Sequence, residues 1–208
     1  MTHPAALTPR KASPRLAFLL GVLLALGGCA QLPGAPESPA PPGFRTLVLP
    51  GRDGATLQAL ERGARVAPLR YRVVVVPGSG CAGMGAFAGR YFAGLLHAQV
   101  LVLHKPGVDP QARTAPGDCA SGFARQDRLS AWLAHARAAL QADALRRQGE
   151  PPVPQLLVGI SEGAELLPAL APEVPQLAGL VLIGASGLDP QQAGALQAER
   201  LGAQAAWA

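Results

Sequence analysis

The chain has 208 residues, of which 49% are hydrophobic, 4% aromatic and 15% charged, with a formal net charge of +5. This length suits one domain with a core of its own, and so small a charge does not indicate a nucleic-acid partner. Three of the 18 basic residues and none of the 13 acidic ones precede Cys29, so the chain from Cys29 onward carries 15 basic and 13 acidic residues, a charge of +2.

The N-terminal segment has the composition of an export signal. Three basic residues precede an apolar stretch over residues 16–28, which is shorter than the ~20 residues that a membrane-spanning helix needs. The stretch ends in Leu26-Gly27-Gly28-Cys29, which resembles the lipobox of bacterial lipoproteins. That resemblance implies a signal peptide over residues 1–28, a lipid on Cys29 and a membrane-tethered protein in the cell envelope that faces the periplasm. An ordinary signal peptide with a chance cysteine is the alternative.

A proline-rich spacer follows over residues 29–43. Its prolines lie among Ala, Ser and Gly, a composition that favours extended chain over packed structure. We therefore expect a single globular domain over residues 44–208.

The domain begins with a predicted hairpin of two strands, residues 44–49 and 55–60, joined through a turn that contains Asp53-Gly54. Residues 71–76, Tyr-Arg-Val-Val-Val-Val, form a β-branched run that is typical of a strand covered on both faces. The pattern then alternates, with predicted helices at 86–98, 124–147 and 162–170 and predicted strands at 99–103, 155–159 and 177–183. This alternation predicts an α/β fold, a mostly parallel sheet with helices on both faces, followed by helical or irregular chain over 190–207.

The helix predicted over 124–147 has one apolar face. Its members recur at helical spacing, so we expect this face to pack on the sheet. They are Leu129, Trp132, Leu133, Ala136 and Leu140.

Gly159-Ile160-Ser161-Glu162-Gly163 stands between a predicted strand and a predicted helix. A serine on such a turn, flanked by glycines that admit neighbouring backbone, is the arrangement of a nucleophile elbow. It predicts Ser161 as the nucleophile of a serine hydrolase. The alternative is an ordinary strand-to-helix turn with a serine near the helix N-cap.

An oxyanion hole needs two backbone amides, one from the residue after the serine and one from the loop after an earlier strand. Glu162 supplies the first, and Ser79 or Gly80 in the loop Pro77-Gly78-Ser79-Gly80 supplies the second. A plain glycine-rich turn is the alternative. The loop lacks the glycine spacing of a dinucleotide site and the lysine of a P-loop, so we expect no cofactor and regard a nucleotide-binding domain as less favoured.

Residues 44–187 resemble the first two thirds of an α/β-hydrolase, with Val73 to Gly80 as third strand and oxyanion loop and Gly159 to Gly163 as the elbow. The resemblance implies acyl transfer to water on a small ester-like substrate. It also places Cys81 and Cys119 after neighbouring strands at one edge of the sheet, which favours a disulfide over two buried thiols in an exported chain.

The same resemblance implies an acid after the sixth or seventh strand and a histidine after the eighth. The pattern predicts no seventh or eighth strand, and no histidine follows His135. Asp189 is either the acid in its less usual place or a helix cap, and His104 is an unusual base or a loop residue. We therefore expect an incomplete hydrolase domain whose activity is low or absent. The alternative is a non-catalytic envelope lipoprotein that uses the same scaffold as a binding module.

Overall fold

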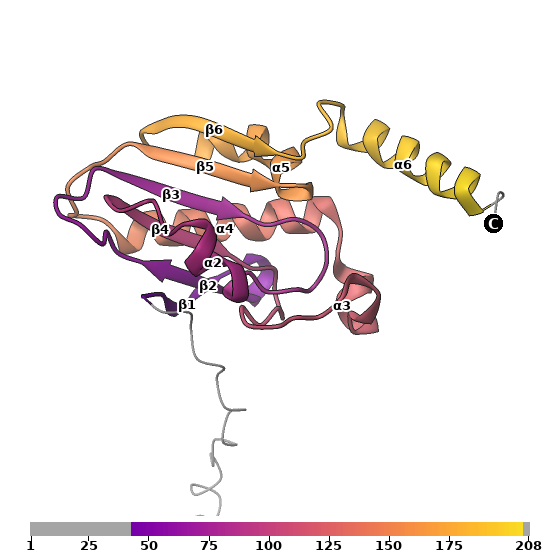
Figure 1. Ribbon diagram of the computed structural model, residues 1–208, viewed down its shortest axis with the longest axis horizontal. Helices are drawn as coiled ribbons and strands as arrows, with labels where there is room; N and C mark the ends of the chain where they lie inside the picture. Colours follow the sequence, from indigo (N-terminus) through magenta and orange to yellow (C-terminus); the bar gives the residue numbers. More distant parts are fainter. Residues whose placement is uncertain (1–42, 206–208) are drawn as a thin grey trace, which may run out of the picture. The chain divides into compact units, whose positions relative to one another are not determined.

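The computed structural model describes residues 43–205 (Figure 1). The predicted signal peptide, Cys29 and most of the proline-rich spacer lie outside these residues. The described part begins with the predicted hairpin, in which β1 (Arg45–Pro50) pairs antiparallel with β2 (Thr56–Arg62). Its turn is a short 3-10 helix, Arg52–Gly54, in which Asp53 and Gly54 have φ values of 55° and 77°. The Asp-Gly step thus supplies the left-handed residues that the turn requires.

The sheet has six strands in the order β1-β2-β4-β3-β5-β6. The remaining four are β3 (Tyr71–Val76), β4 (Ala98–Leu103), β5 (Gln155–Ile160) and β6 (Leu177–Ile183). These four run parallel to one another, whereas β2 joins β4 antiparallel. Val73 to Val76 are all buried in the central strand β3, as its β-branched run predicts. The mostly parallel sheet inferred from the sequence is confirmed.

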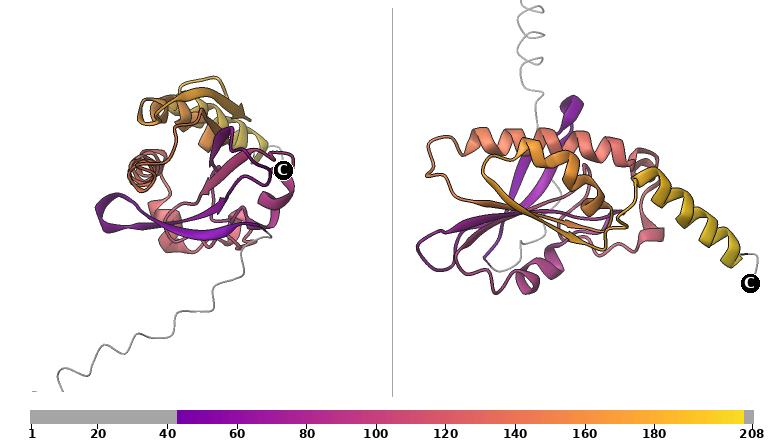
Figure 2. Two further views of the ribbon diagram at one scale, coloured as in Figure 1. Left: turned by 90° about the vertical axis from the view of Figure 1, so that its left-hand side faces the viewer. Right: turned by 90° about the horizontal axis from the view of Figure 1, so that it is seen from above.

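Helices cover both faces of the sheet, as predicted (Figure 2). One face packs against α4 (Leu129–Arg146) and α5 (Glu162–Leu170), and the other against α2 (Gly85–Tyr91). The alternation of side chains along β3 decides which face each residue serves, with Val74 and Val76 beneath α4 and α5 and Val73 and Val75 beneath α2. The helix face predicted over residues 129–140 lies against this core, with its members buried or partly buried.

Two predicted helices differ from the structure. Residues 124–147 form two helices, α3 (Ser121–Gln126) and α4, because Asp127 and Arg128 between them leave helical geometry. Residues 86–98 form only the seven-residue α2, after which β4 already begins at Ala98. The buried Arg62 guanidinium donates to the carbonyls of Phe92 and Leu95 at 3.0 and 2.9 Å, and so satisfies acceptors that a longer helix would have paired.

The sheet ends at β6, which pairs with β5 on one side only within the described residues. Leu180 to Ile183 of β6 are 37 to 49% exposed, so this edge strand keeps an apolar surface open to solvent. Beyond it comes α6 (Pro190–Ala205). Among residues 43–205, no helix combines the length and apolarity that crossing a membrane would require.

Candidate active site

Ser161 occupies a sharp turn between β5 and α5, at the edge of the sheet where the parallel strands end. Its φ of 52° and ψ of −123° lie in a region that side-chain-bearing residues rarely adopt. Its amide donates to the carbonyl of Ile183 at 2.7 Å and its carbonyl accepts from the Ala164 amide at 2.8 Å, so the turn is held at both ends. The side chain is exposed. Strain of this kind costs about 1–3 kcal/mol and concentrates at functional sites.

The two glycines of the motif permit this turn. A Cβ at Gly163 would lie 2.0 Å from the carbonyl oxygen of Val76, and one at Gly159 would lie 2.5 Å from the Cα of Ala164. Both obstacles are backbone atoms, which cannot move aside as a flexible side chain would. Glycine is therefore required at both positions, at Gly163 because α5 starts against the end of β3 and at Gly159 because the first turn of α5 folds back on the end of β5.

The loop after β3 lies against the serine. A Cβ at Gly78 would be 3.0 Å from the Cβ of Ser161 and 3.6 Å from its Oγ. Further along, the Gly80 amide donates to Oδ2 of Asp127 at 3.4 Å. No hydrogen bond from the Ser79 amide is found within residues 43–205, and Ser79 lines the same cleft as Ser161. Of the two amides that the sequence left open, the one of Ser79 is better placed to receive an oxyanion.

A cluster of three charged side chains joins this loop to the elbow. The buried ammonium of Lys105, in the loop after β4, contacts Asp127 at 2.5 Å and Glu162 at 2.6 Å. It also lies 6.0 Å from the centre of the Trp132 ring. Because Asp127 in turn accepts from Gly80, Lys105 connects the residue after Ser161 with the predicted oxyanion loop. Charge-assisted contacts of this length hold their partners more firmly than neutral hydrogen bonds.

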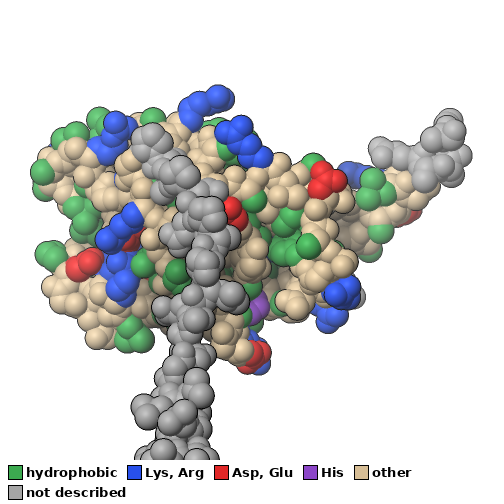
Figure 3. All heavy atoms as spheres, turned by 90° about the horizontal axis from the view of Figure 1, so that it is seen from below, with side chains coloured by type: hydrophobic (Ala, Val, Ile, Leu, Met, Phe, Trp, Pro, Cys, Tyr) green, Lys and Arg blue, Asp and Glu red, His purple; other side chains and the backbone are tan. Residues whose placement is uncertain are grey.

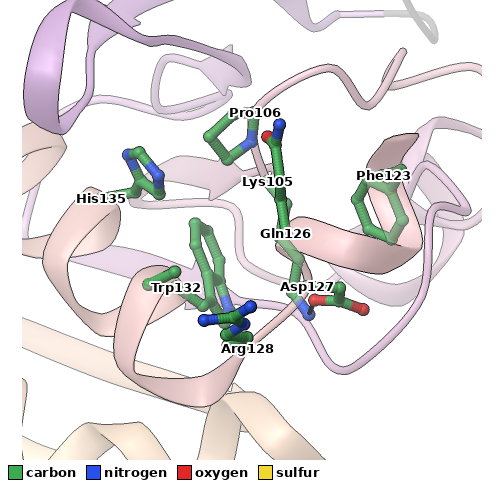
Figure 4. Close-up of a pocket in the computed structure, with 9 residues that line it drawn as sticks. Lys105, Pro106, Phe123, Gln126, Asp127, Arg128, Trp132 and His135 are labelled. Carbon is green, nitrogen blue, oxygen red and sulfur yellow. Dashed lines mark hydrogen bonds and ion pairs between the residues drawn. The ribbon is translucent and has the colours of Figure 1, made fainter. Parts of the chain in front are cut away.

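Ser161 opens into a cleft of about 760 Å³, lined also by Ser79, Leu129, Glu165 and Arg200. A second, smaller hollow of about 30 Å³ lies beside Lys105, with Trp132 and His135 in its wall (Figure 4). The smaller hollow has room for roughly two water molecules. Only the larger cleft both reaches the serine hydroxyl and has space for a small ester, so we take it as the candidate active site.

None of the three histidines within the described residues hydrogen-bonds Ser161. His104 is buried, its Nε2 accepts the Met84 amide at 3.0 Å, and burial lowers its pKa to about 4. Nδ1 of His135 accepts the Arg52 amide at 3.1 Å, and His97 lies 3.1 Å from the carbonyl of Pro68, before β4 begins. His104, the unusual base considered from the sequence, therefore binds the loop after β3 rather than Ser161.

Asp189 lies at the start of α6 and its Oδ1 accepts the Gln192 amide at 3.3 Å, the contact of an N-cap. This geometry fits the helix-cap interpretation. Glu165, on the turn of α5 that lines the cleft, accepts the Ser186 amide at 2.6 Å and so holds the loop after β6.

The predicted disulfide between Cys81 and Cys119 is present, with a Cα–Cα distance of 5.7 Å. It joins the loop after β3 to the long loop after β4, so it fixes the rim next to Ser79 and Gly80. No group of three or more His, Cys, Asp or Glu side chains in residues 43–205 is arranged to hold a metal ion.

Comparison with known proteins finds similarity in structure alone. No protein-family model and no curated protein matches the sequence. Among solved structures, a carboxyl esterase from Bacillus coagulans matches with a TM-score of 0.51 and 20% identity, over 77% of this chain and 49% of that one. Brefeldin A esterase, a bacterial homologue of human hormone-sensitive lipase, matches with 0.47 and 16%, over 85% and 50%. An α/β-hydrolase from Novosphingobium aromaticivorans matches with 0.43 and 20%, over 69% and 44%.

The likeness to the Bacillus coagulans enzyme shows the fold, which is of the α/β-hydrolase type. At 20% identity it does not transfer an activity, and the chain spans about half the length of that enzyme. The six strands of the described residues are the six strands that the sequence predicted.

Sequence reasoning missed the partners of Lys105. Asp127 stood inside a predicted helix, and Glu162 was considered only for its amide. One signal was available: Lys105 follows directly on a buried strand at the edge where the strands end, and a buried lysine there requires acidic partners.

Proposed function

We propose that the chain is an esterase-like serine hydrolase in which Ser161 is the nucleophile. The observation that carries this proposal is the strained turn of Ser161 between β5 and α5, against which Gly78 is packed. A plain N-cap serine needs neither a positive φ nor two glycines in contact with backbone. The hydrolase fold of the chain supports the same interpretation.

The reaction would be acyl transfer from a small ester to water. Oγ of Ser161 gives up its proton and bonds to the carbonyl carbon, and the amides of Glu162 and Ser79 bind the oxyanion; the C–O bond of the ester then breaks, and the leaving alkoxide takes a proton from solvent. Water then releases the acid and restores the serine. Within residues 43–205 no histidine hydrogen-bonds Ser161, and without a base the serine proton passes to solvent and the reaction is slow.

A fluorophosphonate probe tests the nucleophile without knowledge of the substrate. The serine oxygen forms a bond to phosphorus, fluoride leaves and the serine proton goes to the buffer. We expect labelling of the wild type and none of Ser161→Ala. The matched control is Ser186→Ala, which removes another hydroxyl from the same cleft and should keep the label. Equal labelling of the wild type and Ser161→Ala would refute the assignment.

We further propose that the chain is a lipoprotein tethered through Cys29. The proposal rests on the basic residues, the apolar stretch and Leu26-Gly27-Gly28-Cys29 occurring in register. We expect the mature N-terminal peptide to carry acyl chains by mass spectrometry and Cys29→Ser to abolish them. An unmodified Cys29 in the mature protein would contradict the proposal.

The second candidate is a binding module on the same scaffold. It is favoured by the absence of a histidine contact to Ser161 in the described residues, combined with an open cleft of about 760 Å³. A folded protein that never reacts with the probe, but whose cleft binds a small ester-like ligand equally well in wild type and Ser161→Ala, would favour this function over hydrolysis.

A further inference from the structure

One stretch of the chain is cationic without any acidic residue. From Arg62 to Val108 there are six Lys and Arg residues and no Asp or Glu. Arg62, Arg72 and Lys105 are buried and bind protein groups. The other three, Arg65, Arg70 and Arg90, are exposed and form no ion pair with any acidic residue of the described part. The domain thus presents a positive surface that its own fold does not neutralise.

Arg65 and Arg90 lie together although 25 positions separate them in the sequence. Both line one open hollow of about 920 Å³, with Arg62 behind them. Arg62 is fixed by its bonds to the carbonyls after α2, and the amides of Arg65 and Val66 both donate to the carbonyl of Leu96, at 2.8 and 3.0 Å. The segment after β2 and the end of α2 therefore form one continuous surface.

Large apolar side chains stand on the same surface. Phe87 and Tyr91 stack on α2 with ring centres 5.6 Å apart, yet remain 47 and 57% exposed. Val66 and Leu96, which the Val66 amide joins by its hydrogen bond to the Leu96 carbonyl, are exposed by 42 and 43%. We call this surface the basic-aromatic face, and its residues are Arg65, Val66, Phe87, Arg90, Tyr91 and Leu96. Figure 3 shows the domain from below, where basic, acidic and hydrophobic side chains are intermixed on the surface.

We propose that the basic-aromatic face docks on the anionic headgroups of a phospholipid bilayer, the one to which the chain is tethered. The inference goes beyond hydrolysis and rests on the proposed lipid at Cys29. Gly43, where the undescribed N-terminal chain joins the domain, lines the same hollow as Arg65 and Arg90. A spacer of some 14 residues at about 3.1 Å each spans roughly 40 Å, so the tether permits this face to reach the bilayer.

The chemistry of the face matches a lipid surface rather than a dry protein interface. Basic residues are attracted to an anionic leaflet, and tyrosine favours the boundary between headgroups and acyl chains. The two arginines of this face hold the domain weakly by themselves, and tethering raises their effective concentration at the surface. Val66 and Leu96 precede the amino ends of β3 and β4, whereas Ser161 follows β5, so the candidate cleft would open away from the headgroups.

The test uses the mature protein with an environment-sensitive fluorophore on Tyr91→Cys. The protein is placed on vesicles that contain phosphatidylglycerol and brominated lipids, which quench a fluorophore near the acyl chains. The control label is Leu145→Cys, which is 63% exposed on α4, on the opposite face of the sheet. We expect several-fold stronger quenching at position 91 than at position 145. The difference should shrink with added salt, on phosphatidylcholine alone, and in Arg65→Glu/Arg90→Glu.

Equal quenching at the two positions would overturn the proposal and leave the face to a protein partner. The proposal would also be overturned if quenching at position 91 were unchanged by added salt and by Arg65→Glu/Arg90→Glu. Near-ultraviolet circular dichroism checks that each variant is folded. The outcome is separable from the other proposals, because the N-terminal mass reports the lipid and the fluorophosphonate reports Ser161.

Discussion

At the scale of single residues, the site depends on glycines, which lack a side chain, as much as on the side chains that are present. Ser161 reaches its exposed position only because residues 78, 159 and 163 carry no side chain toward the turn. The strain at its φ of 52° is sustained by the hydrogen bonds from its amide to Ile183 and from Ala164 to its carbonyl. A glycine in this motif is thus a packing requirement, which can be measured apart from activity.

Gly163→Ala should destabilise the domain by about 3 kcal/mol or more, since its Cβ would overlap the carbonyl oxygen of Val76 at 2.0 Å. Urea unfolding measures the change in free energy. The matched control is Gly202→Ala in α6, where a Cβ meets nothing within 4 Å and a helical alanine is favourable by up to ~1 kcal/mol. Equal effects of the two substitutions would show that the close approach of α5 to β3 does not exist.

At the scale of elements, Lys105 binds together segments that are far apart in sequence. The loop after β4 supplies the ammonium, the α3–α4 junction supplies Asp127 and the start of α5 supplies Glu162. The two carboxylates repel each other, so they remain close only while the lysine lies between them. The arrangement makes the loop after β3 and the turn at Ser161 one rigid unit.

Lys105→Met should cost about 3–5 kcal/mol of stability, because two carboxylates would remain partly buried without their partner. It should also slow the reaction of Ser161 with the fluorophosphonate by a larger factor than it changes the labelling of side chains that react only in the unfolded protein. A purely global loss of stability would not produce this difference. Chemical unfolding and probe kinetics measure the two effects. The control is Arg137→Met, whose ion pair with Glu173 is substantially exposed and contributes about 0–1 kcal/mol.

The Lys105 cluster also shows which features of the fold the sequence could not predict. Every described strand was predicted within two residues, because buried β-branched runs and the Asp53-Gly54 turn depend on local chemistry alone. The turn at Ser161 between a strand and a helix was predicted for the same reason. The break at Asp127 was not, since the helical pattern continues through it and only the distant Lys105 makes the ion pair more favourable than another helical turn. The length of α2 was missed because Arg62, from another strand, binds the carbonyls of Phe92 and Leu95 in the chain that follows α2.

At the scale of the whole molecule, the fold leaves two unlike surfaces open. The edge strand β6 is apolar, whereas the basic-aromatic face combines arginines with stacked rings. The interior holds buried ion pairs such as Arg72–Asp143 at 2.7 Å, with both side chains 2% exposed, and a buried neutral histidine. Stability should therefore depend on pH through groups far from the serine.

His104 predicts the direction of that dependence. Burial lowers its pKa from 6.5 to about 4, so the folded protein keeps it neutral where the unfolded chain binds a proton. Its contribution is complete above pH 6.5 and is lost as the pH falls toward 4. The loss amounts to roughly 3 kcal/mol over that window. Urea unfolding at a series of pH values measures it.

The variant that isolates this effect is His104→Gln, whose side-chain oxygen can still accept the Met84 amide but takes up no proton. Its free energy of unfolding should be lower than that of the wild type at pH 7 and should fall much less between pH 6.5 and 4.5. His97→Gln, at a partly exposed histidine on the other end of β4, should keep the wild-type slope. If the free energy of unfolding of His104→Gln falls with pH as steeply as that of the wild type, another group causes the pH dependence. The next residue to replace is then His135, whose pKa is lowered by partial burial.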